Sequence, residues 1–398
     1  MIELVTPDKC TGCGACAYSC PKQCIEMRND PVKGLLPYIN QDVCIECGKC
    51  QRTCPVFNPI ELNVPIKAYA ARSLNSEESR TSASGGIACT LYRYALKKGC
   101  SIAGAVWQND YSVNLQSGDT EDWVERFKNS KYVFCNAGPL YPELASLLKK
   151  DKKVVVVGLP CHISAIRKIF KNNPNLLLID IVCHGTTPTQ FLQQHIASIE
   201  KDLNQKSAKV SFRDPRFFTY TFTLTLSEES GKCIYAKRTK DGDTYQYGYH
   251  RAISYRMNCY QCQFANNHRI GDLSLADYPG LGRSGPFLYE KKHINCVLIN
   301  TEKGQTWFDE LMANGLIEAY ERPIEEAVQG NGQLRCPVAK SKARIRFEKA
   351  INRNGGDFEK AMEPIMRKGL RQEKINEIIK IPCRVVRKMI RILKKNGK

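Results

Sequence analysis

The sequence contains no long apolar segment. Its longest apolar runs, Val154–Cys161 and Leu176–Cys183, are far shorter than the roughly 18 to 20 residues that a membrane helix needs, and Asp180 interrupts the second run. The first residues, Met1–Asp8, have neither the basic start nor the apolar stretch that is typical of a secretory signal. We therefore expect a cytoplasmic protein without a membrane-spanning segment.

Compositional extremes are also missing. Hydrophobic residues make up 42% of the chain and charged residues 25%, which is close to ordinary globular usage. This balance excludes wholesale disorder and fibrous repeats. A chain of 398 residues is long enough for two or three compact domains.

Cysteine, in contrast, is abundant. The chain has 20 cysteines, and nine of them lie between residues 10 and 54. In a chain without an export signal, clustered thiols indicate metal or redox chemistry rather than a disulfide framework.

The crowded cysteines form an internal repeat with the spacing Cys-x-x-Cys-x-x-Cys-x-x-x-Cys-Pro. The first run is Cys10, Cys13, Cys16 and Cys20 before Pro21, and the second is Cys44, Cys47, Cys50 and Cys54 before Pro55. In bacterial two-cluster ferredoxins the fourth cysteine of each run binds the other cluster. The two predicted 4Fe-4S ligand sets are therefore Cys10, Cys13, Cys16 and Cys54, and Cys44, Cys47, Cys50 and Cys20.

Zinc is the alternative for these thiols, but zinc ribbons use separated pairs rather than two runs of four. A ninth thiol, Cys24, is interpreted as a buried bystander. Residues 1–60 resemble the bacterial 2x4Fe-4S ferredoxin family, which implies a small α+β domain that transfers electrons. The proline-punctuated stretch 56–66 is predicted to be the linker that leaves this domain.

A strand–helix–strand pattern marks the body of the chain. The β-branched run Val154–Val157 is followed by a helix-like segment, Ile163–Lys171, and by a second apolar run, Leu176–Val182. Such a unit is right-handed and places its two strands in parallel, so their carboxyl ends meet at one sheet edge. Cys161 and Cys183 follow those two ends, where ligands of open α/β sheets bind.

A further close pair, Cys259 and Cys262, brings the number of these thiols to four. Four thiols suffice for a third 4Fe-4S cluster. From the spacing alone, buried single thiols at Cys161 and Cys183 with a zinc or redox-active pair at Cys259 and Cys262 remain an alternative.

Seven segments of the body occur in the order found in the coenzyme F420 hydrogenase/dehydrogenase beta-subunit family, which residues 67–320 resemble. The segments are Ser84-Gly85-Gly86, Ser130-Lys131-Tyr132-Val133, Gly158-Leu159-Pro160-Cys161, Cys183-His184-Gly185, Phe212-Arg213-Asp214, Arg256-Met257-Asn258-Cys259-Tyr260-Gln261-Cys262 and Gly271-Asp272-Leu273-Ser274-Leu275-Ala276-Asp277-Tyr278.

The resemblance implies a body that binds FAD and one 4Fe-4S cluster, and it favours the third cluster. It also implies that five residues lie near the flavin or its phosphates: Ser84, Gly85, Gly86, Ser130 and Lys131. Val133-Phe134-Cys135 and Tyr278-Pro279 depart from the family pattern, so the substrate is not identified.

No catalytic residue is assigned. His162, His184 and Asp277 are candidates to assist proton transfer, although a structural role is the more common one for such residues. The glycine-rich string Gly280–Gly285 matches a dinucleotide fingerprint, but Pro286 follows it and no strand–helix–strand unit encloses it. We interpret this string as a surface loop.

The formal net charge is +19, and much of the excess is at the C-terminal end, where residues 366–398 hold twelve basic residues against two acidic ones. The segment Cys383–Lys395 has apolar residues on one helical face and basic residues on the other. Such a helix can lie on an anionic membrane surface, or it can pack on the body with a solvated basic face. No nucleic-acid-binding motif accompanies the charge, so nucleic acid is not expected as a partner.

These observations predict a mixed α+β and α/β fold in four parts: a dicluster ferredoxin domain (1–60), two parts of a flavin-binding body (61–150 and 151–345) and a basic helical tail (346–398). The predicted function is that of an oxidoreductase which passes electrons between 4Fe-4S clusters and a small-molecule substrate through FAD. A redox partner protein or ferredoxin would exchange electrons with it. The alternatives are a non-catalytic electron-transfer subunit and a reductase of a partner's disulfide.

Overall fold

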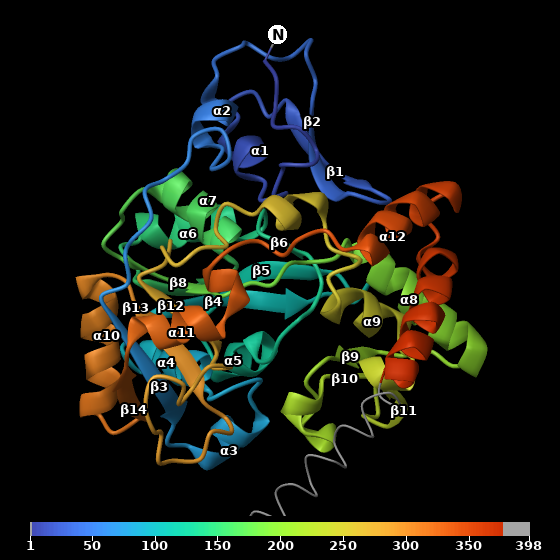
Figure 1. Ribbon diagram of the computed structural model, residues 1–398. Helices are drawn as coiled ribbons and strands as arrows, with labels where there is room; N and C mark the ends of the chain where they lie inside the picture. The colour runs from blue at the N-terminus through green and yellow to red at the C-terminus, as the bar shows by residue number, and fades with distance from the viewer. Residues whose placement is uncertain (1, 377–398) are drawn as a thin grey trace, which may run out of the picture.

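The computed structural model describes residues 2–376, with a small N-terminal module seated on a larger body (Figure 1). The module contains two short helices and one antiparallel hairpin: α1 (Ala15–Ser19), β1 (Ile25–Asp30), β2 (Gly34–Ile39) and α2 (Lys49–Thr53). Residues 56–66 leave it without helix or regular strand, as predicted for a linker.

The cysteine repeat is also a repeat of backbone conformation. Gly14 and Gly48 precede α1 and α2 with φ values of 76° and 67°, in the left-handed region that favours glycine. Cys20 and Cys54 then end the two helices in nearly the same extended conformation. Each cysteine run therefore folds into the same loop and helical turn.

The body is built on a nine-stranded mixed sheet with the order β14-β3-β13-β12-β8-β7-β4-β5-β6. Its strands are β3 (Lys67–Ser73), β4 (Ser101–Trp107), β5 (Val113–Gly118), β6 (Cys135–Asn136), β7 (Val154–Gly158), β8 (Leu176–Ile181), β12 (Leu273–Asp277), β13 (Asn295–Ile299) and β14 (Ile317–Arg322). The predicted parallel pairing of β7 with β8 is confirmed, with Val154 opposite Leu176. β12 adds to β8 in parallel, so three carboxyl ends share one edge.

Helices cover both faces of this sheet, which explains why its central strands are apolar on both sides. The first face carries α4 (Ile87–Lys97), α5 (Glu121–Phe127) and α10 (Glu302–Ala313) over one apolar core. The second carries α6 (Leu140–Lys149), α7 (Pro160–Phe170) and α8 (Thr189–Leu203) over another. The short helix α3 (Ser76–Thr81) lies at the lower end of the body as drawn, and α11 (Ile324–Gly330) packs against β3 (Figure 1).

A second unit of the body stands beside the main sheet (Figure 1). It consists of the antiparallel sheet β9 (Lys209–Ser211), β10 (Thr223–Ser227) and β11 (Cys233–Arg238), with α9 (Thr244–His250), α12 (Lys342–Arg353) and a helical stretch over residues 358–376. Phe347 and Phe358 are buried in the same core as α8. The domain boundary expected at residue 346 therefore falls inside a packed helix, because apolar side chains beyond it complete the body.

A buried histidine joins three elements of this second unit. Nε2 of His195 lies 3.0 Å from Oδ2 of Asp243, and its Nδ1 lies 2.6 Å from Oε1 of Glu359. Burial by itself lowers the pKa of His195, but the two carboxylates outweigh it and raise the pKa to about 10. The imidazolium therefore ties α8 to α9 and to residues 358–376.

The stabilisation by His195 should depend on pH in a defined direction. Because its folded pKa of about 10 exceeds an unfolded value of 6.5, the contribution is complete below pH 6.5 and is lost as pH rises toward 10. We expect His195→Gln to lower the urea midpoint most below pH 6.5, and the difference from the unmodified protein to shrink across that window. The exposed His268→Gln is the control. A difference that stays constant from pH 6.5 to 10 would contradict this role.

Among residues 2–376, no helix is both long enough and apolar enough to cross a bilayer. The amphipathic helix predicted at Cys383–Lys395 lies outside the described residues, so membrane contact through the tail stays a prediction.

Candidate functional site

The first predicted ligand set is brought together at the inner side of the module. Cys10, Cys13, Cys16 and Cys54 line one small cavity, although Cys54 is 38 positions beyond Cys16 in the sequence. Burial raises the pKa of Cys13 to about 11, and the neighbouring thiols of Cys10 and Cys54 add to the rise. Thiols that share such a space resist joint ionisation unless a cation compensates them, which suits an iron-sulfur cluster.

The second set is arranged in the same way at the outer side. Cys44, Cys47, Cys50 and Cys20 line a second cavity with apolar walls that include Ile25 and Ile39. The ninth thiol, Cys24, is also buried there, and its Sγ lies 3.4 Å from Sγ of Cys20. Cys47 is exposed, so this set is the one closer to solvent.

The third set lies in the body at the carboxyl edge of the main sheet. Cys161 is in the first turn of α7 after β7, Cys183 follows β8, and Cys259 and Cys262 belong to the 3-10 turn Met257–Gln261 and its end. All four thiols line one cavity of about 370 Å³. Burial raises the pKa of Cys161 well above its usual range, and the neighbouring thiols of Cys183 and Cys262 raise it further.

The donor set of this cavity fits a 4Fe-4S cluster. Each thiolate of a cubane binds a different iron, so the four sulfurs surround a space rather than meet at one point. In the described part of the chain, no three His, Cys, Asp or Glu side chains are placed to hold a single metal ion.

The third set faces the inner set of the module. Helix α7, which carries Cys161, packs against α1 and α2. The hydroxyl of Tyr141, from α6, donates a 2.5 Å hydrogen bond to the carbonyl of Cys13, and its ring lies 5.4 Å from that of Tyr18. The module is thus docked on the body through the elements that carry its inner thiols.

Three of the five residues expected near a flavin have close contacts inside the protein. Ser84 donates to the Ile294 carbonyl, and Nζ of Lys131 donates to three carbonyls at the end of α5. Gly85 packs so closely on Ala71 and Asn295 that a Cβ would lie 2.6 Å from the Ala71 carbonyl oxygen. Their contact with a flavin stays a prediction.

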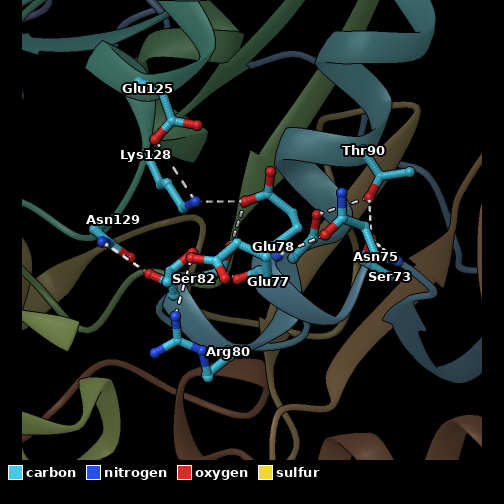
Figure 2. A network of polar contacts seen from close by, with 12 residues as sticks. Ser73, Asn75, Glu77, Glu78, Arg80, Ser82, Thr90, Glu125, Lys128 and Asn129 are labelled. Carbon is cyan, nitrogen blue, oxygen red and sulfur yellow. Dashed lines mark hydrogen bonds and ion pairs between the residues drawn. The ribbon is translucent and has the colours of Figure 1, made fainter.

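A carboxylate lies beside the glycine-rich start of α4. Glu78 is buried and forms an ion pair with Lys128 at 2.8 Å (Figure 2). It also forms an ion pair with Arg93. Gly86, the N-cap of α4, is close enough for a Cβ to lie 3.3 Å from Cγ of Glu78. Negative charge at this helix start therefore comes from the chain itself, and contact of residues 84–86 with a flavin phosphate stays a prediction.

The two segments with predicted flavin contacts nevertheless lie close together. The side chain of Asn129 donates to the Thr81 carbonyl at 3.2 Å, which joins the loop before α4 to the segment that contains Ser130 and Lys131 (Figure 2).

Arg213 connects these segments to the carboxyl edge of the sheet. The residue is 5% exposed, and its Nε donates to the hydroxyl of Tyr132 at 2.6 Å. Its Nη1 lies 3.4 Å from the Ala83 carbonyl, and its Nη2 lies 3.5 Å from Oδ2 of Asp277, at the end of β12. Its guanidinium also lies 3.9 Å from the centre of the Phe222 ring.

Arg213 and Arg256 both lie within the family segments, but no role was predicted for either from the sequence. The sequence did offer a signal: each arginine is a basic residue inside a segment that was selected for its cysteines or for its place in the family order. The three proton-transfer candidates are spread over the same region: His162 is fully buried beside the third thiol set, whereas His184 and Asp277 are exposed at the sheet edge.

The glycine-rich string is held away from this edge. Gly280 approaches the backbone of Gly330, and the amide of Ser284 donates to Glu326 at 2.7 Å. The string thus forms an anchored loop on α11 rather than the start of a dinucleotide-binding helix.

Comparison with known proteins identifies two regions. Residues 9–58 match the 4Fe-4S dicluster domain, and residues 151–325 match the family described as the C-terminal part of the coenzyme F420 hydrogenase/dehydrogenase beta chain. One relative is the F subunit of the F(420)H(2) dehydrogenase from Methanosarcina mazei, with 25% identity over 340 residues, which are 81% of this chain and 87% of the relative.

A solved structure of the F420-reducing NiFe hydrogenase complex from Methanosarcina barkeri contains a similar chain. It has 19% identity and a TM-score of 0.47, and the match covers 73% of this chain and 94% of that one. The two matched regions agree with the cysteine repeat and with the order of the body segments. Residues 151–325 of this chain belong to the coenzyme F420 hydrogenase/dehydrogenase beta-subunit family, and residues 9–58 form a 4Fe-4S dicluster domain.

Proposed function

We propose that this protein is a flavin- and iron-sulfur-dependent oxidoreductase that exchanges electrons between a redox partner and a small molecule. One observation carries the proposal: the third thiol set lines a cavity at the sheet edge against which the module packs and to which Arg213 is joined through Asp277. The carboxyl ends of β7, β8 and β12 meet there, and this is the edge at which open α/β sheets bind their ligands.

Four groups of residues would hold the cofactors. Two thiol sets in the module and the third in the body would each hold a 4Fe-4S cluster, with FAD beside Arg213. A flavin takes up two electrons as hydride and releases them singly, whereas each cluster carries one electron at a time. A flavin beside a cluster therefore converts two-electron transfer into one-electron transfer. Ligands of the third cluster would be Cys161, Cys183, Cys259 and Cys262.

The surroundings of Arg213 suit an anionic, planar ligand. Its guanidinium is buried against the rings of Tyr132 and Phe222, and it lies 3.5 Å from Asp277, whose side chain is 56% exposed. A guanidinium binds phosphate or a flavin carbonyl through directed hydrogen bonds. Ser84, Gly85, Gly86, Ser130 and Lys131 would shape the backbone around that ligand, because Ala83 and Tyr132 both contact Arg213.

The cofactor content of the anaerobically purified protein tests the proposal. About twelve irons per chain, with equivalent acid-labile sulfide and about one FAD, are expected for three cubanes and a flavin. About eight irons without flavin would contradict both the third cluster and the flavin.

A non-catalytic electron-transfer subunit is the second candidate, and one observation favours it. The outer thiol set is bordered by exposed apolar side chains, Val43 and Ile45, beside the exposed Cys47. Such a surface suits the docking of a redox partner protein. The two functions differ in flavin content and in the ability of the isolated protein to reduce a dye.

Replacement of Arg213 should separate flavin binding from cluster binding. We expect Arg213→Gln to lower the FAD content per chain at least tenfold with iron unchanged, because it removes the buried cation that faces the ligand. Arg216→Gln is the matched control, since Arg216 pairs with Asp214 at 2.6 Å in the same segment and is 49% exposed. Equal flavin content in both variants would place the flavin elsewhere.

A further inference from the structure

A buried guanidinium lies between the module and the third thiol set. Arg256 is 3% exposed and belongs to the segment that also contains Cys259. Its backbone amide donates to the Thr186 carbonyl at 2.8 Å, and its carbonyl accepts from the amide of Cys259 at 3.1 Å. The residue is therefore fixed in the body beside two of the loops that carry the third set.

The side chain of Arg256 reaches across into the module. Its guanidinium donates to four backbone carbonyls there: Thr11 at 2.7 Å, Leu35 at 3.0 Å, Lys33 at 3.1 Å and Cys10 at 3.4 Å. The module is shaped to receive it, because a Cβ on Gly12 would lie 2.9 Å from Nη1 and Nη2. On the other side, the guanidinium lies 4.4 Å from the centre of the Phe134 ring.

All four hydrogen-bond acceptors of Arg256 are neutral, although a buried cation is costly unless negative charge balances it. Cysteines of both sets are neighbours of Arg256: its guanidinium donates to the Cys10 carbonyl, and its own carbonyl accepts from the amide of Cys259. Arg256 also lines the cavity that contains the third set. Thiolates and their clusters are anionic, so they supply the balancing charge from both sides.

We propose that Arg256 is the shared counter-charge of two iron-sulfur sites, the inner site of the module and the site in the body. The inference rests on the proposed function, because the body site is part of it. As a positioning residue, Arg256 holds the Cys10 and Cys259 loops together. Its charge stabilises the reduced, more negative form of each cluster and thereby raises both reduction potentials.

The test is an EPR-monitored redox titration of the full chain, with iron counted in each preparation. Arg256→Gln should make one-electron reduction at the inner and body sites about tenfold less favourable, which is ~59 mV for a one-electron couple. The outer site of Cys20, Cys44, Cys47 and Cys50 should be unaffected. Arg256→Lys keeps the charge and should restore most of the potential.

Arg344→Gln is the matched control. Arg344 is also a buried arginine, and it donates to the Ile253 carbonyl in the body at 2.8 Å without reaching the module. Unshifted potentials in an iron-replete Arg256→Gln variant, or an equal shift in Arg344→Gln, would overturn the inference. If Arg256→Gln does not retain iron, Arg256→Lys decides: a tenfold loss despite the retained charge would also overturn it.

The same preparations distinguish the two proposals. Eight irons in the unmodified protein would refute the body site, while the potential of the inner site would still report on Arg256. Twelve irons with no effect of Arg256→Gln would leave the proposed function standing and refute the counter-charge.

Discussion

A double Cys259→Ser and Cys262→Ser variant is expected to lose about four irons per chain, one cubane, and to retain about eight. The two thiols supply half of the third ligand set, and they come from one short turn, whereas Cys161 and Cys183 come from α7 and the end of β8. Two remaining thiols cannot hold a cubane. Iron and sulfide analysis with EPR of the reduced protein would measure the loss.

Two thiols outside all three sets provide the control for that variant. Cys336 is exposed and Cys233 is half-buried on β11, where it donates to the Tyr235 carbonyl. A Cys233→Ser and Cys336→Ser variant should keep its full iron. An unchanged iron count in the Cys259 and Cys262 variant would refute the third cluster even if the dicluster module is loaded.

The second large effect is expected at a buried ion pair. Asp180→Ala should lower the free energy of unfolding by about 3 to 5 kcal/mol, because it leaves the guanidinium of Arg269 buried and unpaired. Both side chains are at most 1% exposed, and the Asp180 carboxylate also accepts from the amide of Gly271 at 2.7 Å. Urea denaturation of the loaded protein would measure the change.

The exposed pair of Arg238 and Asp241 calibrates this measurement. Both side chains are about 40% exposed, at 42% and 38%, so Asp241→Ala should cost no more than about 1 kcal/mol. A double Asp180→Ala and Arg269→Met variant should recover part of the loss, since it removes the unpaired charge. Similar costs for Asp180→Ala and Asp241→Ala would contradict the role assigned to the buried pair.

Arg269 also links this pair to the third thiol set. It donates to the carbonyls of Phe264 and Asn266, just after Cys262. The ion pair therefore fixes the chain between β8 and the Cys259–Cys262 turn, so the same variant should make the third set easier to strip of iron with a chelator than the module.

Short-range patterns were sufficient for much of the fold. The apolar runs predicted β7 and β8 as parallel neighbours. The resemblance in the body was confirmed by the match over residues 151–325. The boundary at residue 346 could not be found this way, because burial of Phe347 and Phe358 depends on distant elements.

The sequence by itself determined which cysteines form the two predicted ligand sets of the module. Ligands of one cubane must be spaced to suit a tight loop, and this spacing is local. It also determined which strands end beside Cys161 and Cys183, since periodicity and connection length are local as well. Only the tertiary structure decided that Cys259 and Cys262 share a cavity with them, that Arg256 reaches the module and that Arg213 gathers four separate segments. Those contacts join residues up to 246 positions apart, and no local pattern records such a separation.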